Sequence, residues 1–182
     1  EECHSVDIPV FVEPLSYSVE PSIAKGSEAF ALLRPEIVID TVSRLSKLGP
    51  DVLKIEFPLD PVHDTSALKA ARLCEEISEV TTCPWTLLSA GVDFEDYVRQ
   101  YEIAAKSGAS GYVAGRAIWK ECIPMSPSAR QNFLDVTAAD RIRKLNEITA
   151  KYARPWTDFY RPEPAGEHWY RHYPDLCGQS GR

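Results

Sequence analysis

Short apolar runs alternate along the chain with longer stretches in which apolar residues recur every three or four positions. The short runs are typical of strands buried in a sheet, and the longer stretches are typical of amphipathic helices. The predicted strands cover residues 8–13, 51–57, 84–89 and 111–115. The predicted helices cover residues 34–48, 65–80, 93–107 and 128–152, with a short helix between 116 and 121.

Local signals set the ends of these helices. Pro35 suits the first position of a helix, so we expect the first helix to open at Arg34-Pro35-Glu36. Thr65 or Ser66 can cap the second helix, because a hydroxyl oxygen can accept a hydrogen bond from a free N–H of the first turn. Asp93 is expected to cap the third helix in the same way.

Four strand–helix repeats predict an α/β fold with parallel strands and right-handed crossovers. Two architectures fit this order: a small open sheet, or about the C-terminal half of a (β/α)8 TIM-barrel fold, which as a whole needs about 250 residues. Residues 1–153 would form this unit of four βα repeats. Residues 154–182 form a C-terminal extension rich in proline and aromatic residues, read as an extended arm, with a lid or an oligomer contact as the alternatives.

The composition of the chain limits the kinds of molecule that it is expected to bind. The 182 residues carry a net charge of -7, with a pI near 5.1, which argues against nucleic acid as the main partner. No apolar run approaches the roughly 18 residues of a membrane span. Five scattered cysteines without a C-x-x-C motif fit reduced thiols. We therefore expect a cytoplasmic protein without nucleic-acid or membrane partners, and homo-oligomer formation stays open.

Lys54 stands out because it interrupts an apolar strand. Leu53, Ile55 and Phe57 would share one face of this strand, and Lys54 and Glu56 the other. If the first face packs on helices, Lys54 points to the opposite side, where desolvation favours the neutral amine that attacks a carbonyl. A structural ion pair of Lys54 with Glu56 or with Glu13 explains the pattern equally well.

Other strand ends carry residues suited to chemistry, since function in parallel α/β folds gathers at the carboxyl ends of strands. Glu13 ends the first strand and could act as a general acid/base, or as a counter-ion of Lys54 or a cap on the following loop. Small residues let backbone N–H groups approach an anion, and an arginine supplies a charged fork. The candidate anion site comprises Ser89, Ala90, Gly91, Gly115 and Arg116, although tight turns alone could also require these glycines.

The sequence offers little support for a metal or cofactor. The four histidines do not cluster at strand ends, as the ligands of a zinc site would. His168 and His172 have the spacing of a metal pair on a helix, but nearby proline and glycine disfavour a helix there. No dinucleotide-binding glycine motif occurs. No cofactor is therefore expected.

Four motifs in chain order resemble the class I aldolases of the DeoC/LacD family, in the group of tagatose 1,6-bisphosphate and sulfofructose-phosphate aldolases. The resemblance covers residues 3–123, which would be strands five to eight of the barrel. The motifs are Val12-Glu13-Pro14, Asp51-Val52-Leu53-Lys54-Ile55-Glu56-Phe57-Pro58, Leu88-Ser89-Ala90-Gly91-Val92 and Ala114-Gly115-Arg116-Ala117-Ile118-Trp119.

The resemblance implies a role for each strand end. Lys54 would be the Schiff-base lysine and Glu13 the nearby acid/base, while Glu56 receives no chemical step. The glycine turns and Arg116 would bind the phosphate, or a sulfonate, of a phosphorylated sugar. The family also uses residues from the first half of the barrel, including a second lysine, so this chain would hold part of the catalytic set.

Three functions remain open at this point. The first is cleavage of a phosphorylated ketose to dihydroxyacetone phosphate and an aldehyde. The second is non-catalytic binding of a phosphosugar, which would need Arg116 but no reactive amine. The third is a half-barrel that acts only when it is paired with another half.

Overall fold

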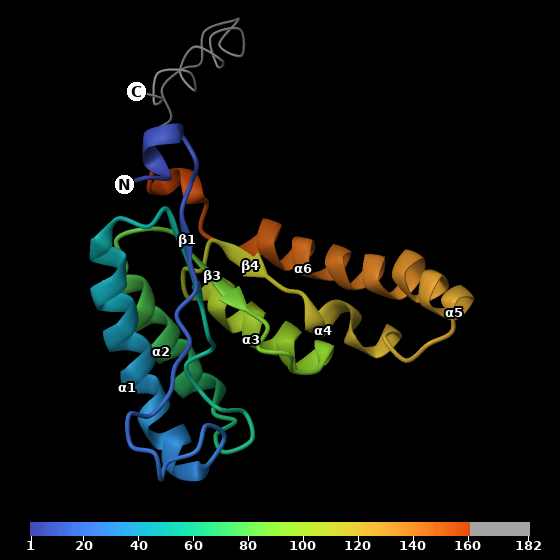
Figure 1. The fold of residues 1–182 in the computed structure, drawn as a ribbon, viewed down its shortest axis with the longest axis horizontal. Coiled ribbons are helices and arrows are strands. Elements are labelled where there is room, and N and C mark those ends of the chain that lie inside the picture. Colours follow the sequence, from blue (N-terminus) through green and yellow to red (C-terminus); the bar gives the residue numbers. More distant parts are fainter. Residues whose placement is uncertain (161–182) are drawn as a thin grey trace, which may run out of the picture.

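The sheet contains four parallel strands in the order in which they occur along the chain (Figure 1). The computed structural model describes residues 1–160. The strands are β1 (Phe11–Val12), β2 (Val52–Ile55), β3 (Trp85–Leu88) and β4 (Gly111–Val113). Each strand pairs with the next one in parallel, so all four carboxyl ends lie at the same edge of the sheet. A doubly wound sheet would instead reverse its strand order part-way.

Helices follow one another in a layer against this sheet. α1 packs on α2, α2 on α3, and α3 on α6. In Figure 1, α5 and α6 extend away from the sheet. The long helices are α1 (Glu28–Leu45), α2 (Ala67–Val80), α3 (Phe94–Lys106) and α6 (Ala139–Tyr152). Shorter pieces are α4 (Arg116–Trp119), α5 (Pro127–Asn132), a π-helical turn (Phe133–Ala138) and 3-10 turns at His4–Val6, Ser46–Leu48, Lys120–Cys122 and Trp156–Asp158. The predicted α/β class is confirmed.

The core lies between the sheet and the helices. Leu53, Ile55 and Phe57 are buried, while Lys54 between them is partly exposed, as the alternation along β2 predicts. On β3, Trp85 and Leu87 are also fully buried. Burial of an aliphatic side chain of this size contributes about 1.5–3 kcal/mol, so this alternation fixes which face of β2 meets the helices.

The prediction for the start of α1 was wrong. The helix begins at Glu28, and the Ser27 side chain accepts a hydrogen bond from the Phe30 N–H. Pro35 therefore lies inside the helix, where the missing N–H and the ring cost about 3 kcal/mol. The first turns bury Phe30 completely and Arg34 almost completely, and this tertiary burial outweighs the local cost of the proline.

Of the two other predicted helix caps, the structure confirms one and corrects the other. Ser66 caps α2, because its side chain accepts a hydrogen bond from the Lys69 N–H. Asp93 precedes α3 but makes no capping hydrogen bond, since its carboxylate pairs with Lys120 at 2.7 Å. The predicted last helix is continuous from 127 to 152, with a π-helical turn within it.

The first strand is shorter than predicted. Only Phe11–Val12 of the expected residues 8–13 pairs with β2, and Pro9 has no N–H to donate to a ladder. At the other end of the described chain, the Tyr160 hydroxyl donates a 2.6 Å hydrogen bond to the Asp51 carbonyl, beside the start of β2. The rest of the predicted extension, including His168 and His172, lies outside the described residues, and the proposed boundary at 153 stays a prediction.

Candidate active site

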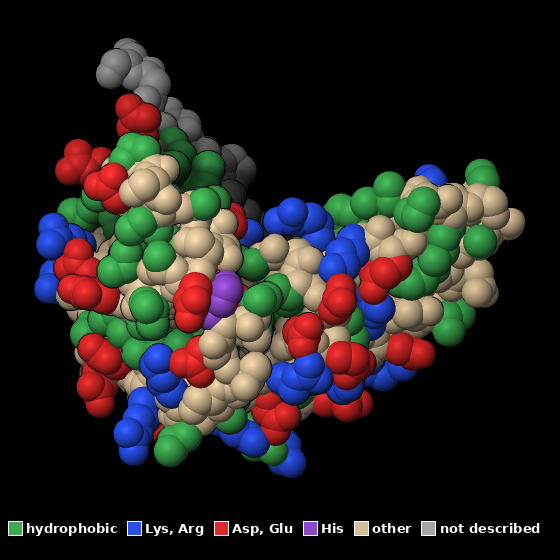
Figure 2. Space-filling model, turned by 90° about the horizontal axis from the view of Figure 1, so that it is seen from below, with side chains coloured by type: hydrophobic (Ala, Val, Ile, Leu, Met, Phe, Trp, Pro, Cys, Tyr) green, Lys and Arg blue, Asp and Glu red, His purple; other side chains and the backbone are tan. Residues whose placement is uncertain are grey.

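A pocket of about 380 Å³ opens at the carboxyl ends of the strands. Figure 2 shows the molecule from the side on which the loops after β1 and β2 lie, and acidic and basic side chains are intermixed there. Six of the seven predicted site residues line the pocket: Glu13, Lys54, Ser89, Ala90, Gly115 and Arg116. The seventh, Gly91, lies against Arg116, because a Cβ added there would come within 3.2 Å of the Arg116 guanidinium carbon. The structure thus brings together residues more than 100 positions apart.

Lys54 and Glu13 form an ion pair at one side of this pocket. The Lys54 Nζ donates a 2.8 Å hydrogen bond to the Glu13 Oε2. The Lys54 side chain is 23% exposed and the Glu13 side chain 44% exposed. Of the two ion pairs considered from the sequence, the one with Glu13 forms, and Glu56 is engaged elsewhere. A pair of this exposure contributes about 0–1 kcal/mol, so the contact is easily rearranged when a ligand enters.

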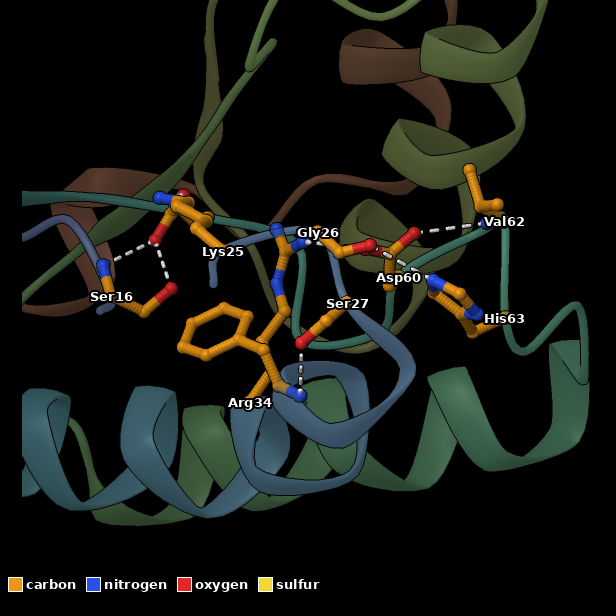
Figure 3. A network of polar contacts seen from close by, with 10 residues as sticks. Ser16, Lys25, Gly26, Ser27, Arg34, Asp60, Val62 and His63 are labelled. Atoms are coloured by element: carbon orange, nitrogen blue, oxygen red, sulfur yellow. Dashed lines mark hydrogen bonds and ion pairs between the residues drawn. The ribbon is translucent and has the colours of Figure 1, made fainter. Parts of the chain in front are cut away.

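Glu56 is the buried carboxylate of the site. It accepts hydrogen bonds from the Ser16 N–H at 2.5 Å, the Ser16 hydroxyl at 2.6 Å and the Lys25 ammonium at 2.7 Å (Figure 3). Burial raises the pKa of this carboxyl, but the hydrogen bonds from Lys25 and Ser16, with the nearby Arg34 charge, outweigh burial. The pKa of Glu56 therefore lies below its ordinary value of 4.5, and the group is ionised near neutral pH.

Further polar contacts hold the first turns of α1, and the segment before it, beside the loop that follows β2 (Figure 3). The nearly buried Arg34 lies 3.9 Å from the Asp60 carboxylate, which also accepts a hydrogen bond from the Val62 N–H. The His63 ring contacts the Gly26 carbonyl at 3.1 Å. Together with the contacts of Glu56, the Gly26 contact holds the irregular segment from which Lys25 lines the pocket.

The opposite side of the pocket is suited to an anion. Ala90 and Gly91 both have positive φ, 49° and 78°, in a tight turn that follows β3. The missing side chain of Gly91 leaves room for the Arg116 guanidinium. Among residues 1–160, no carboxylate pairs with Arg116, so its charge is available to a ligand. α4 has only four residues, so the dipole at its start adds little, and the site depends on Arg116.

Sequence reasoning missed Lys25 and Ser16. Lys25 lines the same pocket, and both residues contact Glu56. They lie in the irregular stretch between β1 and α1, where no periodic pattern points to a partner. Within residues 1–160, no three His, Cys, Asp or Glu side chains gather where they could hold a metal ion. None of the helices described is long and apolar enough to cross a membrane.

Comparison with known proteins identifies the family of this chain. The model of the DeoC/LacD family aldolases matches residues 1–121, which include β1 to β4 and every predicted site residue. The chain belongs to this family. It is 33% identical over 174 residues to a tagatose 1,6-diphosphate aldolase of Lactococcus lactis subsp. lactis, covering 86% of this chain and 53% of the relative.

Other relatives have a similar sequence identity to this chain and are covered to a similar extent. It is 31% identical to the tagatose 1,6-diphosphate aldolase of Listeria monocytogenes serotype 4a, with 87% of this chain and 52% of the relative covered. It is also 31% identical to tagatose 1,6-diphosphate aldolase 1 of Streptococcus pyogenes serotype M3, with 86% and 53% covered. The chain therefore spans about half the length of these DeoC/LacD relatives.

Proposed function

We propose that this chain carries the Schiff-base half of an aldolase that cleaves a phosphorylated ketose. The observation that carries the proposal is that Lys54, Glu13 and Arg116 share one pocket. They supply an amine, a proton carrier and an anion-binding group, which are the parts that imine-forming cleavage of a phosphosugar requires. The names of the relatives support the same reaction class.

The proposed reaction starts at Lys54. Its neutral amine adds to the ketone carbon, and loss of water gives an iminium ion. A base removes the proton of the C4 hydroxyl while the electrons of the C3–C4 bond move into the iminium, which releases an aldehyde and leaves an enamine on Lys54. A proton returns to C3, and water hydrolyses the new imine to release dihydroxyacetone phosphate. Glu13 lies 2.8 Å from the reacting nitrogen, within reach of these proton transfers.

The charge in the pocket supports this substrate class. Arg116 can form two parallel hydrogen bonds with a phosphate, and the glycine turn leaves space for its oxygens. Tagatose 1,6-bisphosphate and a sulfonated ketose phosphate both fit this requirement. We also propose that the four βα units are the C-terminal half of a (β/α)8 barrel, because the strand order is unswitched and the relatives are about twice as long.

Borohydride trapping tests the mechanism. The protein is incubated with dihydroxyacetone phosphate, reduced with borohydride and digested, and the modified lysine is located by mass spectrometry. Lys54 should gain the mass of the reduced adduct, and Lys54→Arg should abolish it. Lys25→Arg is the matched control, because Lys25 lines the same pocket. Adduct at Lys25 or another lysine, or no adduct, would overturn the assignment.

A second function, phosphosugar binding without turnover, is favoured by one feature. Lys54 forms an ion pair with Glu13, whereas Arg116 has no carboxylate partner within residues 1–160. Anion binding at Arg116 therefore does not depend on a reactive amine. Calorimetric titration with dihydroxyacetone phosphate distinguishes the two functions. Binding that survives Lys54→Met, together with absence of trapping in the unmodified chain, would support binding alone.

A further inference from the structure

Glu13 lies between two points at which its segment is attached, one on β2 and one at Glu56 just beyond β2. On one side, Val12 pairs in register with Leu53. On the other side, the backbone N–H and hydroxyl of Ser16 donate to Glu56. The segment from 12 to 16 is thus attached to β2 and its continuation at both ends, and the Glu13–Lys54 contact lies between the two attachments.

Of the two side-chain contacts of this segment, the hydrogen bonds between Ser16 and Glu56 are stronger than the ion pair between Glu13 and Lys54. Glu56 is 3% exposed and accepts three short hydrogen bonds, two of them from Ser16. Hydrogen bonds to an ionised acceptor are roughly twice as strong as neutral ones. The Glu13 carboxylate, by contrast, is 44% exposed, and Lys54 is its partner among the described residues. An exposed ion pair alone fixes two flexible side chains poorly.

We propose that Glu56 is a positioning residue, which holds Glu13 against Lys54 through its hydrogen bonds to Ser16. This positioning role rests on the proposed function in one respect, which is that Glu13 and Lys54 are the pair that transfers protons. Four charged groups line the pocket with Lys54: Glu13 after β1, Lys25 in the following segment, Glu56 beyond β2, and Arg116 after β4. Neither the position of Glu56 after β2 nor the family resemblance assigns this positioning role.

The consequence of losing this attachment can be measured at Lys54. When Ser16 is released, Glu13 gains freedom, and the Lys54 ammonium loses part of its partner. The amine is then less often held by the Glu13 carboxylate, and it reacts faster with a small aldehyde. Proton transfer through Glu13 becomes slower at the same time. A merely structural role of Glu56 would lower stability without changing the rate at which Lys54 reacts.

The test is the rate of Lys54 methylation by formaldehyde and cyanoborohydride at one fixed pH, read by mass spectrometry, because the amine must leave its ion pair before it forms the imine that is reduced. In Glu56→Gln, Lys54 labelling should become faster, by up to about fivefold for loss of an exposed ion pair. In Ser16→Ala, which removes the hydroxyl donor but keeps the backbone N–H donor, it should become faster by a smaller factor. Ser22→Ala is the matched control, because Ser22 lies in the same segment and hydrogen-bonds Glu20 instead.

A double-mutant cycle separates positioning from a direct charge effect. In a Glu13→Gln background, Ser16→Ala should not change the labelling rate further, and Glu56→Gln should lose most of its effect. An effect that persists in full in that background, or an unchanged labelling rate in both single variants, would overturn the proposal. Circular dichroism checks the fold, and Ser16→Ala carries the test alone if Glu56→Gln unfolds.

This labelling needs no aldolase activity, so it tests the positioning role independently. If dihydroxyacetone phosphate fails to trap at Lys54, the proposed function fails while the labelling result stands. If trapping succeeds and the labelling rate does not change, the positioning role alone fails.

Discussion

Gly91 offers a sharp test of the anion site, because its missing side chain makes room for Arg116. Gly91→Ala imposes two costs. The first is backbone strain, since φ at this position is 78° and an L-residue in the left-handed region costs about 1–2 kcal/mol. The second is a collision, since the new Cβ would lie 3.2 Å from Cζ and 3.4 Å from Nε of Arg116. The guanidinium must move away from the turn.

The two costs appear in different measurements. Strain of about 1–2 kcal/mol should lower the melting temperature by roughly 2–8 °C for a chain of this size. Displacement of Arg116 should weaken binding of dihydroxyacetone phosphate by about tenfold to a hundredfold, because a hydrogen bond to a charged group contributes about 1.5–3 kcal/mol. Thermal unfolding and calorimetric titration measure the two effects on the same sample.

Gly49→Ala is the matched control. Gly49 has nearly the same φ, 82°, but an added Cβ there meets nothing within 4 Å, and the residue lies away from the pocket. It should therefore show the same loss of stability and unchanged binding of dihydroxyacetone phosphate. Equal binding by Gly91→Ala and Gly49→Ala would refute the reasoning that Arg116, held against Gly91, binds the anion.

Two further predictions concern stability. The lowered pKa of Glu56 means that its ionised form is favoured by folding, so its contribution is present above about pH 4.5 and is lost as the pH falls through the lower folded value. The free energy of urea unfolding should therefore fall as the pH is lowered below about 4.5. Glu56→Gln should make this fall smaller, and an unchanged fall would show that other carboxyls cause it. Ser66→Ala removes the α2 cap and should cost about 1 kcal/mol in urea unfolding, whereas Ser22→Ala should cost less.

Local patterns predicted the strands and most helices, because apolar alternation and helical spacing depend only on neighbouring residues. The burial of Leu53 and Ile55 opposite Lys54 followed directly from the period of two. The convergence of the strand ends was also predictable, because parallel strands in order must bring their carboxyl ends to one edge. The start of α1 was not predictable, because burial of Phe30 and Arg34 outweighs the signal of Pro35.

The sequence by itself determined that Lys54 and Glu56 lie on the same side of the extended segment 51–57, and that glycine turns and Arg116 follow the neighbouring strands. Only the tertiary structure decided which carboxylate meets Lys54. Glu56 turns instead to Ser16 and Lys25, which precede it by 40 and 31 residues in an irregular segment. The path of such a segment is set by buried charge that must be hydrogen-bonded, and no periodic pattern along the chain encodes that requirement.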